Sequence, residues 1–358
     1  MAERPLDLHG RPLGVLRLSL TARCNLACPY CCPDLEDPPD LLTLAERLAL
    51  VEATVGLGVH TLRLTGGEPL LHRRLEELIA ALQPLRRRDP GDPRGALREI
   101  ALTSNGVLLG AERARQLKAA GLDRITLSLD GTDGASVARM AGLSGAAAGE
   151  AVLEKVLAAI RHAREAGFDP ARGALKLNAV ITHSGNADQL LPLAELAREQ
   201  GLELRLIEFM DVGNRNGWAP EQVLPAAEMV ARIGAVWPLE PVGRAPHGTA
   251  GRWHYRDRAA AGVGADGGAH LAVVASITAP FCGDCNRLRI TADGVAYSCL
   301  FAATGTDLKP WLRPQPEPAR LRRALEELWR ARRDRWSEER QEAVDQRQAP
   351  AEMAYLGG

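Results

Sequence analysis

The sequence predicts an α/β protein in which six strand–helix units precede a smaller α+β region. Apolar segments typical of strands alternate with amphipathic segments typical of helices from residue 14 to residue 210. Several helical segments end at a glycine, which readily adopts the left-handed conformation of a common helix cap. Such alternation favours a parallel sheet with right-handed crossovers. Periodicity alone leaves open whether the six units close partly into a barrel or form an open sheet.

Six segments have the composition of strands, and five segments between them have the periodicity of helices. Thr43 and Glu46 have the spacing of a capping box at the start of the first helix. The expected strands are residues 14–20, 60–65, 98–104, 124–130, 174–181 and 202–210. The expected helices are residues 43–58, 73–83, 110–121, 151–167 and 187–201.

Two segments interrupt the alternation. Residues 86–95 are polar and rich in turn-forming residues, and residues 140–150 are rich in Gly and Ala. We expect residues 140–150 to be a mobile loop or a loop shaped around another group. Beyond residue 211 we expect irregular sequence, then strands around tight turns, then a polar helix over roughly residues 317–345 with a solvated Arg/Glu-rich face. We therefore predict three parts, at residues 1–210, 211–312 and 313–358.

The composition is that of a soluble globular enzyme. Hydrophobic residues make up 46% of the 358 positions and charged residues 25%, and the formal net charge is −1. A near-neutral chain is not expected to bind nucleic acid or a membrane as a whole, so any anion site must be local. The N-terminus lacks the pattern of a signal peptide, and no uncharged apolar run reaches the roughly 18 residues of a membrane helix. We expect a cytoplasmic protein, in which disulfides are rare.

The cysteines fall into two groups, which indicates metal chemistry rather than scattered core positions. The 249 residues from 33 to 281 contain none of them. Short spacing within each group predicts two metal sites. The first group is Cys24, Cys28, Cys31 and Cys32, and the second is Cys282, Cys285 and Cys299.

Cys24, Cys28 and Cys31 form a C-x3-C-x2-C motif directly after the first expected strand. Three thiolates on one short loop can hold three corners of a cubane iron–sulfur cluster, and the fourth iron then stays open to another ligand. Zinc fits less well because structural zinc takes four protein ligands, and a disulfide is disfavoured in this compartment. Cys32 could replace Cys31 as a ligand, but we interpret it as a bystander thiol.

The first motif resembles the signature of the radical S-adenosylmethionine (SAM) superfamily, which has an aromatic residue at the position of Tyr30. GGEP, residues 66–69, follows the second expected strand and matches the segment whose backbone meets the SAM amino group. The ends of the fourth and sixth strands form the edge at which α/β folds bind ligands. The resemblance implies that a [4Fe-4S] cluster binds SAM and cleaves it to a 5′-deoxyadenosyl radical. The implied SAM-binding residues are Tyr30, Gly67, Ser128 and Met210.

The second cysteine group allows two interpretations from its spacing alone. A zinc site would need a fourth ligand, and His247, His254 and His270 are candidates. The surrounding sequence FCGDCNRLRITADG, however, resembles the C-terminal motif of the GTP 3′,8-cyclase family of molybdenum cofactor biosynthesis. The motifs LRLSLTARCNLACPYC, LRLTGGEPL, LTSNG, ITLSLDG, LKLNAVI and LRLIEFM occur in the order of that family.

That resemblance implies an incomplete (βα)6 radical-SAM barrel, followed by a C-terminal α+β region that carries a second Fe-S cluster. Cys282, Cys285 and Cys299 would bind this second [4Fe-4S] cluster, whose open iron would bind the purine of GTP. The terminal Gly357 and Gly358 match a tail that, in the family, reaches into the active-site cavity and is needed for activity.

GTP carries about four negative charges, which a near-neutral protein must meet with local cations. Arg17, Arg63 and Lys176 lie within expected strands. Arg287 and Arg289 are two residues apart on an expected strand and would face the same side. The resemblance implies catalytic roles for Arg17, Arg287 and Arg289. It implies that GTP binds to Arg17, Arg63, Thr103, Lys176, Arg287, Leu288 and Arg289.

The resemblance also implies a reaction and partners. The radical would abstract the C3′ hydrogen of GTP, and the ribose radical would attack C8 of guanine, to give (8S)-3′,8-cyclo-7,8-dihydroguanosine 5′-triphosphate. Cyclic pyranopterin monophosphate synthase would use this product, flavodoxin or ferredoxin would supply electrons, and the enzyme would be a homodimer. Two alternatives stay open. One is another radical SAM enzyme with an auxiliary cluster, such as a peptide-modifying enzyme, and the other is a non-catalytic zinc-binding protein.

Overall fold

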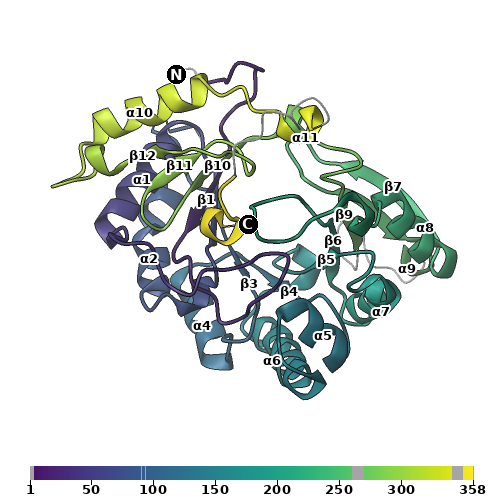
Figure 1. Ribbon diagram of the computed structural model, residues 1–358. Helices are drawn as coiled ribbons and strands as arrows, with labels where there is room; N and C mark the ends of the chain where they lie inside the picture. The colour runs from purple at the N-terminus through teal and green to yellow at the C-terminus, as the bar shows by residue number, and fades with distance from the viewer. Residues whose placement is uncertain (1–3, 90, 93, 260–269, 341–349, 358) are drawn as a thin grey trace.

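A computed structural model describes residues 4–89, 91–92, 94–259, 270–340 and 350–357. Its strands form one curved, twelve-stranded sheet in the order β12-β11-β10-β1-β2-β3-β4-β5-β6-β9-β8-β7. Helices cover the convex side of this sheet, and the C-terminal segment lies on the concave side (Figure 1). None of the described helices is long and apolar enough to span a membrane.

The six expected strands are all present, and they pair in parallel in chain order. They are β1 (Val15–Ser19), β2 (Thr61–Thr65), β3 (Glu99–Ser104), β4 (Arg124–Ser128), β5 (Leu175–Ile181) and β6 (Glu203–Glu208). The helices between them are α1 (Leu44–Gly56), α2 (Leu75–Ala81), α3 (Gln83–Arg86), α4 (Ala111–Ala120), α5 (Gly134–Ala141), α6 (Ala146–Glu165) and α7 (Leu190–Glu199). The capping box of Thr43 and Glu46 is confirmed at the start of α1. The single helix expected at residues 73–83 is instead divided into α2 and α3.

The expectation of a loop at residues 140–150 is wrong, because α5 and α6 occupy most of this stretch. Its glycines allow the two helices to pack closely. A Cβ on Gly149 would lie 1.9 Å from the carbonyl oxygen of Gly134. The small residues therefore serve helix packing, a role that composition alone does not distinguish from loop flexibility. The end of α5 also contacts the first cysteine loop, since the N–H of Ala27 donates to the carbonyl of Ala141 at 3.1 Å.

The strands after residue 210 extend the same sheet at both of its edges. β9 (His270–Val274) pairs in parallel with β6, and β10 (Arg287–Ile290) pairs in parallel with β1. The outer strands are β7 (Leu239–Arg244), β8 (Gly251–Tyr255), β11 (Val295–Tyr297) and β12 (Thr306–Asp307). The remaining helices are α8 (Ala226–Val236), α9 (Arg256–Ala259), α10 (Pro318–Arg330), α11 (Trp336–Glu339) and α12 (Met353–Leu356). The division of the chain at residues 210 and 312 stays a prediction.

The polar helix expected at residues 317–345 is shorter in the structure, because α10 ends at Arg330. Its apolar face buries Leu321, Leu325 and Trp329, and α10 packs against α1. Its polar face is exposed as expected: the side chain of Arg323 is 82% exposed. Residues 341–349 lie outside the described residues.

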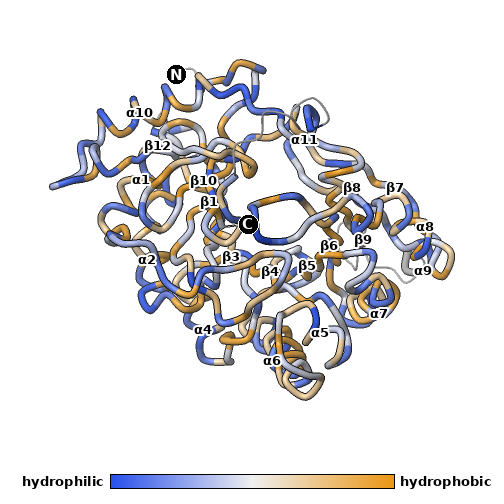
Figure 2. The backbone as a smooth tube through the Cα atoms, viewed as in Figure 1, coloured by the Kyte–Doolittle hydropathy of each residue, from blue (hydrophilic) through white to orange (hydrophobic). Residues whose placement is uncertain are grey.

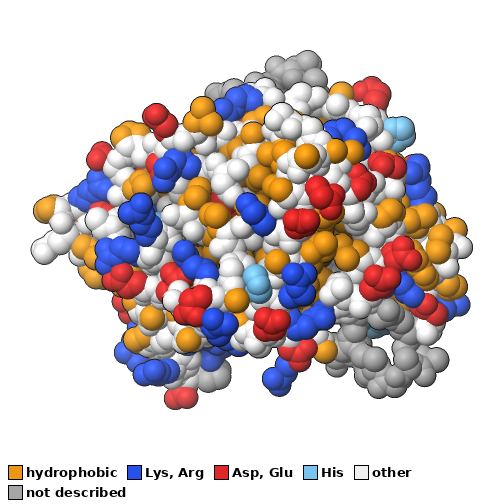
Figure 3. All heavy atoms as spheres, turned by 90° about the horizontal axis from the view of Figure 1, so that it is seen from below, with side chains coloured by type: hydrophobic (Ala, Val, Ile, Leu, Met, Phe, Trp, Pro, Cys, Tyr) orange, Lys and Arg blue, Asp and Glu red, His pale blue; other side chains and the backbone are white. Residues whose placement is uncertain are grey.

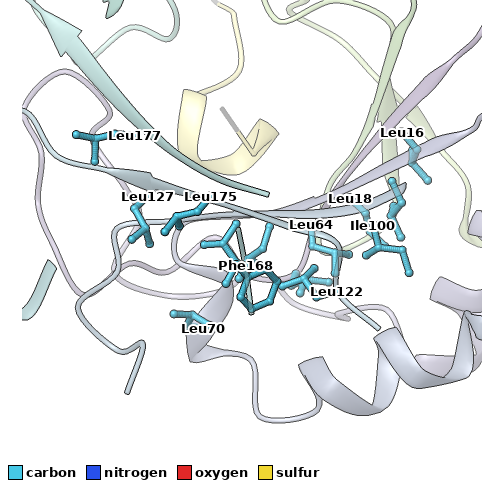
Figure 4. Close-up of a cluster of buried hydrophobic side chains, with 14 of the residues drawn as sticks. Leu16, Leu18, Leu64, Leu70, Ile100, Leu122, Leu127, Phe168, Leu175 and Leu177 are labelled. Carbon is cyan, nitrogen blue, oxygen red and sulfur yellow. The ribbon is translucent and has the colours of Figure 1, made fainter. Parts of the chain in front are cut away.

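Alternation along the strands separates the core from the concave side of the sheet. Leu16, Leu18, Leu62 and Leu64 are 0% exposed and belong to the cluster of buried leucines and other apolar side chains between sheet and helices (Figure 4). Successive side chains of a strand point to opposite faces, so the arginines between these leucines face the concave side. Figure 2 shows that hydrophobic and hydrophilic residues are mixed along the backbone of the sheet and of the helices that cover it.

The outer surface carries mixed charge. On the face seen from below in Figure 3, Lys and Arg side chains are interspersed with Asp and Glu side chains. This distribution agrees with the formal net charge of −1. Separation of charge is instead found on the concave side of the sheet.

Candidate active site

Both cysteine groups line a single cavity on the concave side of the sheet. The lining includes Cys24, Cys28, Cys31, Cys282, Cys285 and Cys299. All seven cysteines of the chain are free thiols. The fold thus brings together two motifs that are separated by 249 residues in the sequence.

The first cysteine loop follows β1 and has a tight turn. The N–H groups of Cys31 and Cys32 donate to the carbonyl of Cys28 at 3.0 and 2.9 Å. The GGEP segment after β2 packs directly against this loop: a Cβ on Gly67 would lie 2.2 Å from the carbonyl oxygen of Arg23. Glycine is therefore required at this position, because any side chain would push the two segments apart.

The buried Glu68 connects the GGEP segment to β3. Its carboxylate accepts from the N–H of Leu70 at 2.9 Å, from Ser104 Oγ at 2.8 Å and from the N–H of Asn105 at 2.8 Å. Burial raises the pKa of Glu68 to about 7. Asn105 reaches on to the first cysteine loop, since its Nδ2 lies 3.6 Å from Cys24 Sγ. We did not predict either residue, although both lie in motifs that the sequence singles out.

Tyr30 is held by a second buried acid. Its hydroxyl donates to Asp130 Oδ2 at 2.7 Å, and Asp130 Oδ1 accepts from the N–H of Val180 at 2.8 Å. Burial raises the pKa of Asp130 to about 6. Asp130 follows Ser128 at the end of β4, and both line the cavity. The motif LSLDG contains the signal for Asp130, because a carboxylate directly after a buried strand reaches the same edge as the serine.

The thiols of the first loop are surrounded by negative charge. Burial, followed by the neighbouring thiols Cys24 and Cys32 and by Asp130, raises the pKa of Cys31 to about 12. Burial and then Asp130 raise the pKa of Cys28 well above its usual value. Thiolates here need a strong cationic partner such as iron. The predicted SAM-binding residues Tyr30, Gly67, Ser128 and Met210 all line the same cavity.

The second cysteine loop is surrounded by positive charge. The side chain of Arg287 donates to Cys285 Sγ from Nε at 3.3 Å and from Nη2 at 3.1 Å. Burial alone would raise the pKa of Cys285, but Arg287, Arg332 and Arg289 outweigh burial and lower this pKa to about 5. Cys299 differs, because burial and then Asp334 raise its pKa to about 11.

Three arginines lie side by side on adjacent strands next to the second loop. Arg17 on β1 is in register with Arg63 on β2 and with Arg289 on β10. Burial, and then the charge of neighbouring arginines, lowers the pKa of Arg17 well below its usual value and that of Arg289 to about 10. Arg63 donates to Thr103 Oγ1 at 2.7 Å, and its pKa is lowered to about 9, mainly by burial.

The Nε atoms of Arg17 and Arg289 have no hydrogen-bond partner among the described residues. Buried like charges with unused donors are unfavourable unless an anion binds between them. This part of the cavity is therefore suited to a polyanion. Arg287 and Arg289 both line the cavity, as expected for residues two apart on one strand.

Two predicted GTP-binding residues are not found among the described residues that line the cavity. Lys176 is paired with Glu203 at 3.0 Å. The side chain of Leu288 is 0% exposed and belongs to the hydrophobic core. Of the predicted tail, the carbonyl of Gly357 accepts from Thr65 Oγ1 at 3.0 Å, whereas Gly358 lies outside the described residues.

Each cysteine group brings three free thiols to the cavity, which is a ligand set that a cubane cluster with one open iron can use. Within the described ranges, no three His, Cys, Asp or Glu side chains converge closely enough to hold one metal ion. Zinc ligands all lie about 2.0–2.3 Å from the metal, whereas a cubane cluster is bound by thiolates at separate corners. His254 and His270, considered as zinc ligands, contact each other through their Nδ1 atoms at 3.0 Å. His247 lies 3.2 Å from the carbonyl of Asp284.

Family models match most of the chain. The model described as the radical SAM superfamily matches residues 18–197, and the model described as molybdenum cofactor synthesis C matches residues 202–338. The two matched segments contain one cysteine group each.

Curated relatives and solved structures agree with these models. The chain is 59% identical over 354 residues to a protein named GTP 3′,8-cyclase from Synechococcus sp. (strain CC9902), covering 99% of this chain and 98% of that protein. It is 42% identical to the GTP 3′,8-cyclase of Xanthomonas campestris pv. campestris (strain B100), over 98% of this chain and 97% of that protein. The fold is similar to that of Streptococcus suis SuiB bound to S-adenosylmethionine, with a TM-score of 0.58 at 14% identity, over 90% of this chain and 67% of that chain.

Proposed function

The chain belongs to the GTP 3′,8-cyclase family of radical SAM enzymes, and from this premise we propose how its residues divide the work of that reaction. The enzyme acts in molybdenum cofactor biosynthesis. We propose that it converts GTP to (8S)-3′,8-cyclo-7,8-dihydroguanosine 5′-triphosphate with SAM and two [4Fe-4S] clusters. The observation that carries the proposal is the meeting of two cysteine groups and a row of arginines in one cavity.

The two cysteine groups hold the two clusters. Cys24, Cys28 and Cys31 bind the first, and Cys282, Cys285 and Cys299 bind the second. When bound, the first cluster supplies the electron that cleaves SAM, and the second offers an open iron to the purine of GTP. Cys32 is not needed as a ligand: its Sγ lies 3.0 Å from the carbonyl of Pro29, and it does not line the cavity.

The residues near the first loop bind and orient SAM. The backbone around Gly67 meets the amino group, and Ser128 and Met210 contact the rest of the molecule. Tyr30 is locked by its hydrogen bond to Asp130, so the loop keeps one conformation. Enclosure within the cavity keeps water and other hydrogen donors away from the reacting atoms.

The residues near the second loop bind GTP. Arg17, Arg287 and Arg289 hold the phosphates and ribose and thereby place C3′ within reach of the radical. Arg63 and Thr103, joined by a hydrogen bond of 2.7 Å, extend this surface. Lys176 acts indirectly, through its ion pair with Glu203, and Leu288 contributes through its backbone between the two arginines.

The test is anaerobic turnover. The protein is reconstituted with iron and sulfide, and SAM, dithionite and GTP are added. We expect about eight irons per chain, GTP-dependent 5′-deoxyadenosine and an isomer of GTP by mass spectrometry. Deoxyadenosine release that ignores GTP would retain the radical SAM chemistry and overturn the substrate, and a peptide-modifying activity would then be the alternative.

Three further features belong to the proposal. We propose a cytoplasmic homodimer that takes electrons from flavodoxin or ferredoxin. Cyclic pyranopterin monophosphate synthase would consume the product. The C-terminal tail would reach into the cavity on the side of the GGEP segment, which the contact between Gly357 and Thr65 supports.

A further inference from the structure

Three buried charged residues meet at the second cysteine loop, and two of them contact its backbone. Asp7 and Arg11 come from the N-terminal turn, and Arg332 follows α10. Their side chains are 0%, 2% and 2% exposed. We refer to Asp7, Arg11 and Arg332 as the clasp.

The clasp holds the backbone of two cysteines. Arg11 Nη1 donates to the carbonyl of Cys282 at 2.7 Å, and Arg332 Nη1 donates to the carbonyl of Cys285 at 2.6 Å. Asp7 Oδ2 accepts from Arg11 Nε at 2.6 Å and from Arg332 Nη1 at 3.2 Å. One carboxylate thus orients two guanidinium groups, and each guanidinium group fixes one cysteine carbonyl.

The N-terminal turn is itself built to present Asp7. The other carboxylate oxygen, Oδ1, accepts from the N–H groups of His9 and Arg11 at 2.9 Å each. Trp329 donates from Nε1 to the carbonyl of Arg11 at 3.1 Å, and Arg332 lies over the ring of Trp329 at 4.7 Å. The turn and α10 therefore support the clasp from two sides.

The clasp carries a net positive charge that is buried. Two guanidinium groups face one carboxylate, and Arg11 Nη2 has no hydrogen-bond partner in the described part of the chain. Asp334, whose side chain is 31% exposed, pairs with Arg332 at 3.7 Å and offsets part of this charge. Arg287 and Arg289 add positive charge from the cavity side. Burying unbalanced charge destabilises the fold, which suggests that the clasp has a function at the second cysteine loop.

We propose that Asp7, Arg11 and Arg332 are positioning residues of the second cluster, which hold the carbonyls of Cys282 and Cys285 and raise the reduction potential of the cluster. The inference rests on the proposed function, since it assumes the second cluster. Outer residues that orient metal ligands typically change metal affinity by about 10- to 100-fold when they are replaced. Nearby positive charge favours the more negative, reduced form of a cluster and so raises its potential.

Two substitutions with opposite electrostatic signs test the proposal. Arg332→Gln removes positive charge, and Asp7→Asn removes negative charge. We expect the potential of the second cluster, measured by redox titration with electron paramagnetic resonance, to fall in Arg332→Gln and to rise in Asp7→Asn. A purely structural role would weaken cluster binding in both variants without this change of sign. Arg332→Lys keeps the charge, so its potential should stay close to that of the unmodified protein.

Arg198→Gln is the matched control. Arg198 is also buried, pairs with Asp257 and lies over the rings of Trp237 and Tyr255 at 4.9 and 4.2 Å, but it does not contact either cysteine loop. It should lower stability and leave both potentials unchanged. GTP-independent cleavage of SAM in every variant reports that the barrel and the first cluster are intact.

The outcomes separate the two proposals. Suppose that the unmodified protein binds about eight irons per chain and that Arg332→Gln and Asp7→Asn leave the potential of the second cluster unchanged. This result would overturn the role of the clasp and retain the second cluster. About four irons in the unmodified protein would overturn the second cluster, and the clasp with it. If Arg332→Gln loses the second cluster entirely, the iron content falls by half. The potential of Asp7→Asn then decides the proposal: a rise supports it, and no change or a fall overturns it.

Discussion

The two cysteine loops of this protein offer the same ligands in opposite electrostatic surroundings. The first loop lies near Glu68 and Asp130, and the pKa of Cys31 is raised to about 12, by burial and then by nearby negative groups. The second lies among arginines, and the pKa of Cys285 is lowered to about 5 against the effect of burial. Charge around Cys31 and Cys285 therefore distinguishes the two ends of the cavity, in addition to the different cysteine spacing.

The difference matches the proposed placement of SAM at the first loop and of GTP at the second. SAM carries a sulfonium and an ammonium group against one carboxylate, so it is a cation overall, whereas GTP is a polyanion. A cavity that is acidic at one end and basic at the other can orient both molecules by their charge alone, without specific contacts to the base of GTP or the methyl group of SAM. Each end also buries like charges together, which is unfavourable for the protein on its own and favours ligands of opposite charge.

The largest expected effect separates the two loops directly. Cys28→Ser should abolish both SAM cleavage and GTP cyclisation, because the electron for both comes from the first loop. Cys285→Ser should abolish cyclisation and retain SAM cleavage. Iron content should fall from about eight to about four per chain in each variant, and 5′-deoxyadenosine and product are quantified by mass spectrometry. Equal loss of SAM cleavage in both variants would mean that the loops do not act independently.

Arg17→Ala tests the basic end. Truncating one partner of a buried charge pair costs about 2–5 kcal/mol, so GTP affinity should fall by roughly 30- to 5,000-fold. SAM affinity and both clusters should be retained. Calorimetry with each ligand measures the two affinities, and Arg323→Ala on the exposed face of α10 is the control. Full cyclisation by Arg17→Ala would contradict the assignment of the GTP site.

Glu68→Gln tests the acidic end in the metal-free protein. The folded-state pKa of Glu68 is raised to about 7 by burial. The carboxyl therefore favours folding below the unfolded pKa near 4.5, and this advantage is lost as pH rises through about 7. The advantage of the unmodified protein over Glu68→Gln should shrink by on the order of 3 kcal/mol between pH 4.5 and 8. Denaturant unfolding at several pH values measures it.

The exposed Glu77 serves as the control for Glu68→Gln, because its contribution to stability should depend on pH in the opposite direction. Arg74 lowers the pKa of Glu77 through a hydrogen bond, so any contribution of Glu77 to stability is present at high pH and lost at low pH. The advantage over Glu77→Gln should thus grow slightly as pH rises. A pH dependence for Glu68→Gln that matches the one for Glu77→Gln would contradict the burial argument.

The smallest expected effect concerns the connection between the first loop and the C-terminal tail. Arg215 Nη2 donates to the carbonyl of Cys32 at 2.9 Å, and its Nε lies 3.3 Å from Glu352. The side chain of Arg215 is 46% exposed, so the pair contributes about 1 kcal/mol or less. Arg215→Ala should slow cyclisation by at most about 5-fold and increase digestion of the tail by carboxypeptidase.

A surface pair of similar exposure provides the comparison for Arg215→Ala. Arg232 and Glu228 on α8 are each 42% exposed, and Arg232→Ala should change neither cyclisation nor digestion of the tail. A loss of cyclisation above about 100-fold in Arg215→Ala would show that this contact does more than an exposed ion pair can.

Strand periodicity predicted the six parallel strands and the face to which several of their side chains point. Arg17 and Arg63 stand between fully buried leucines, and this pattern alone indicates that they face the other side of the sheet. Lys176 also stands between buried leucines. Its ion pair with Glu203 depends on which strand lies beside it, and the sequence of one strand does not reveal its neighbour. Leu288 is apolar and lies between two arginines, so its place in the core follows from alternation.

The features that the sequence did not reveal depend on contacts between distant segments. The packing of Gly149 against Gly134 requires two helices to meet, and composition is compatible with a loop as well. The clasp joins Asp7 to Arg332, and neither residue lies in a recognisable motif. The pairing of β9 and β10 with opposite edges of the sheet requires the last third of the chain to reach both sides.

That pairing has a consequence for how the protein is made. β1 and β6 are the outer strands of the six-stranded part, and their partners β10 and β9 are synthesised only after residue 269. While the ribosome is still producing the middle of the chain, both outer strands therefore lack their final partners, and such edges pair readily with other chains. The segment that ends this exposure also contains the second cysteine loop, so a chain released early is prone to aggregation and lacks the second cysteine group.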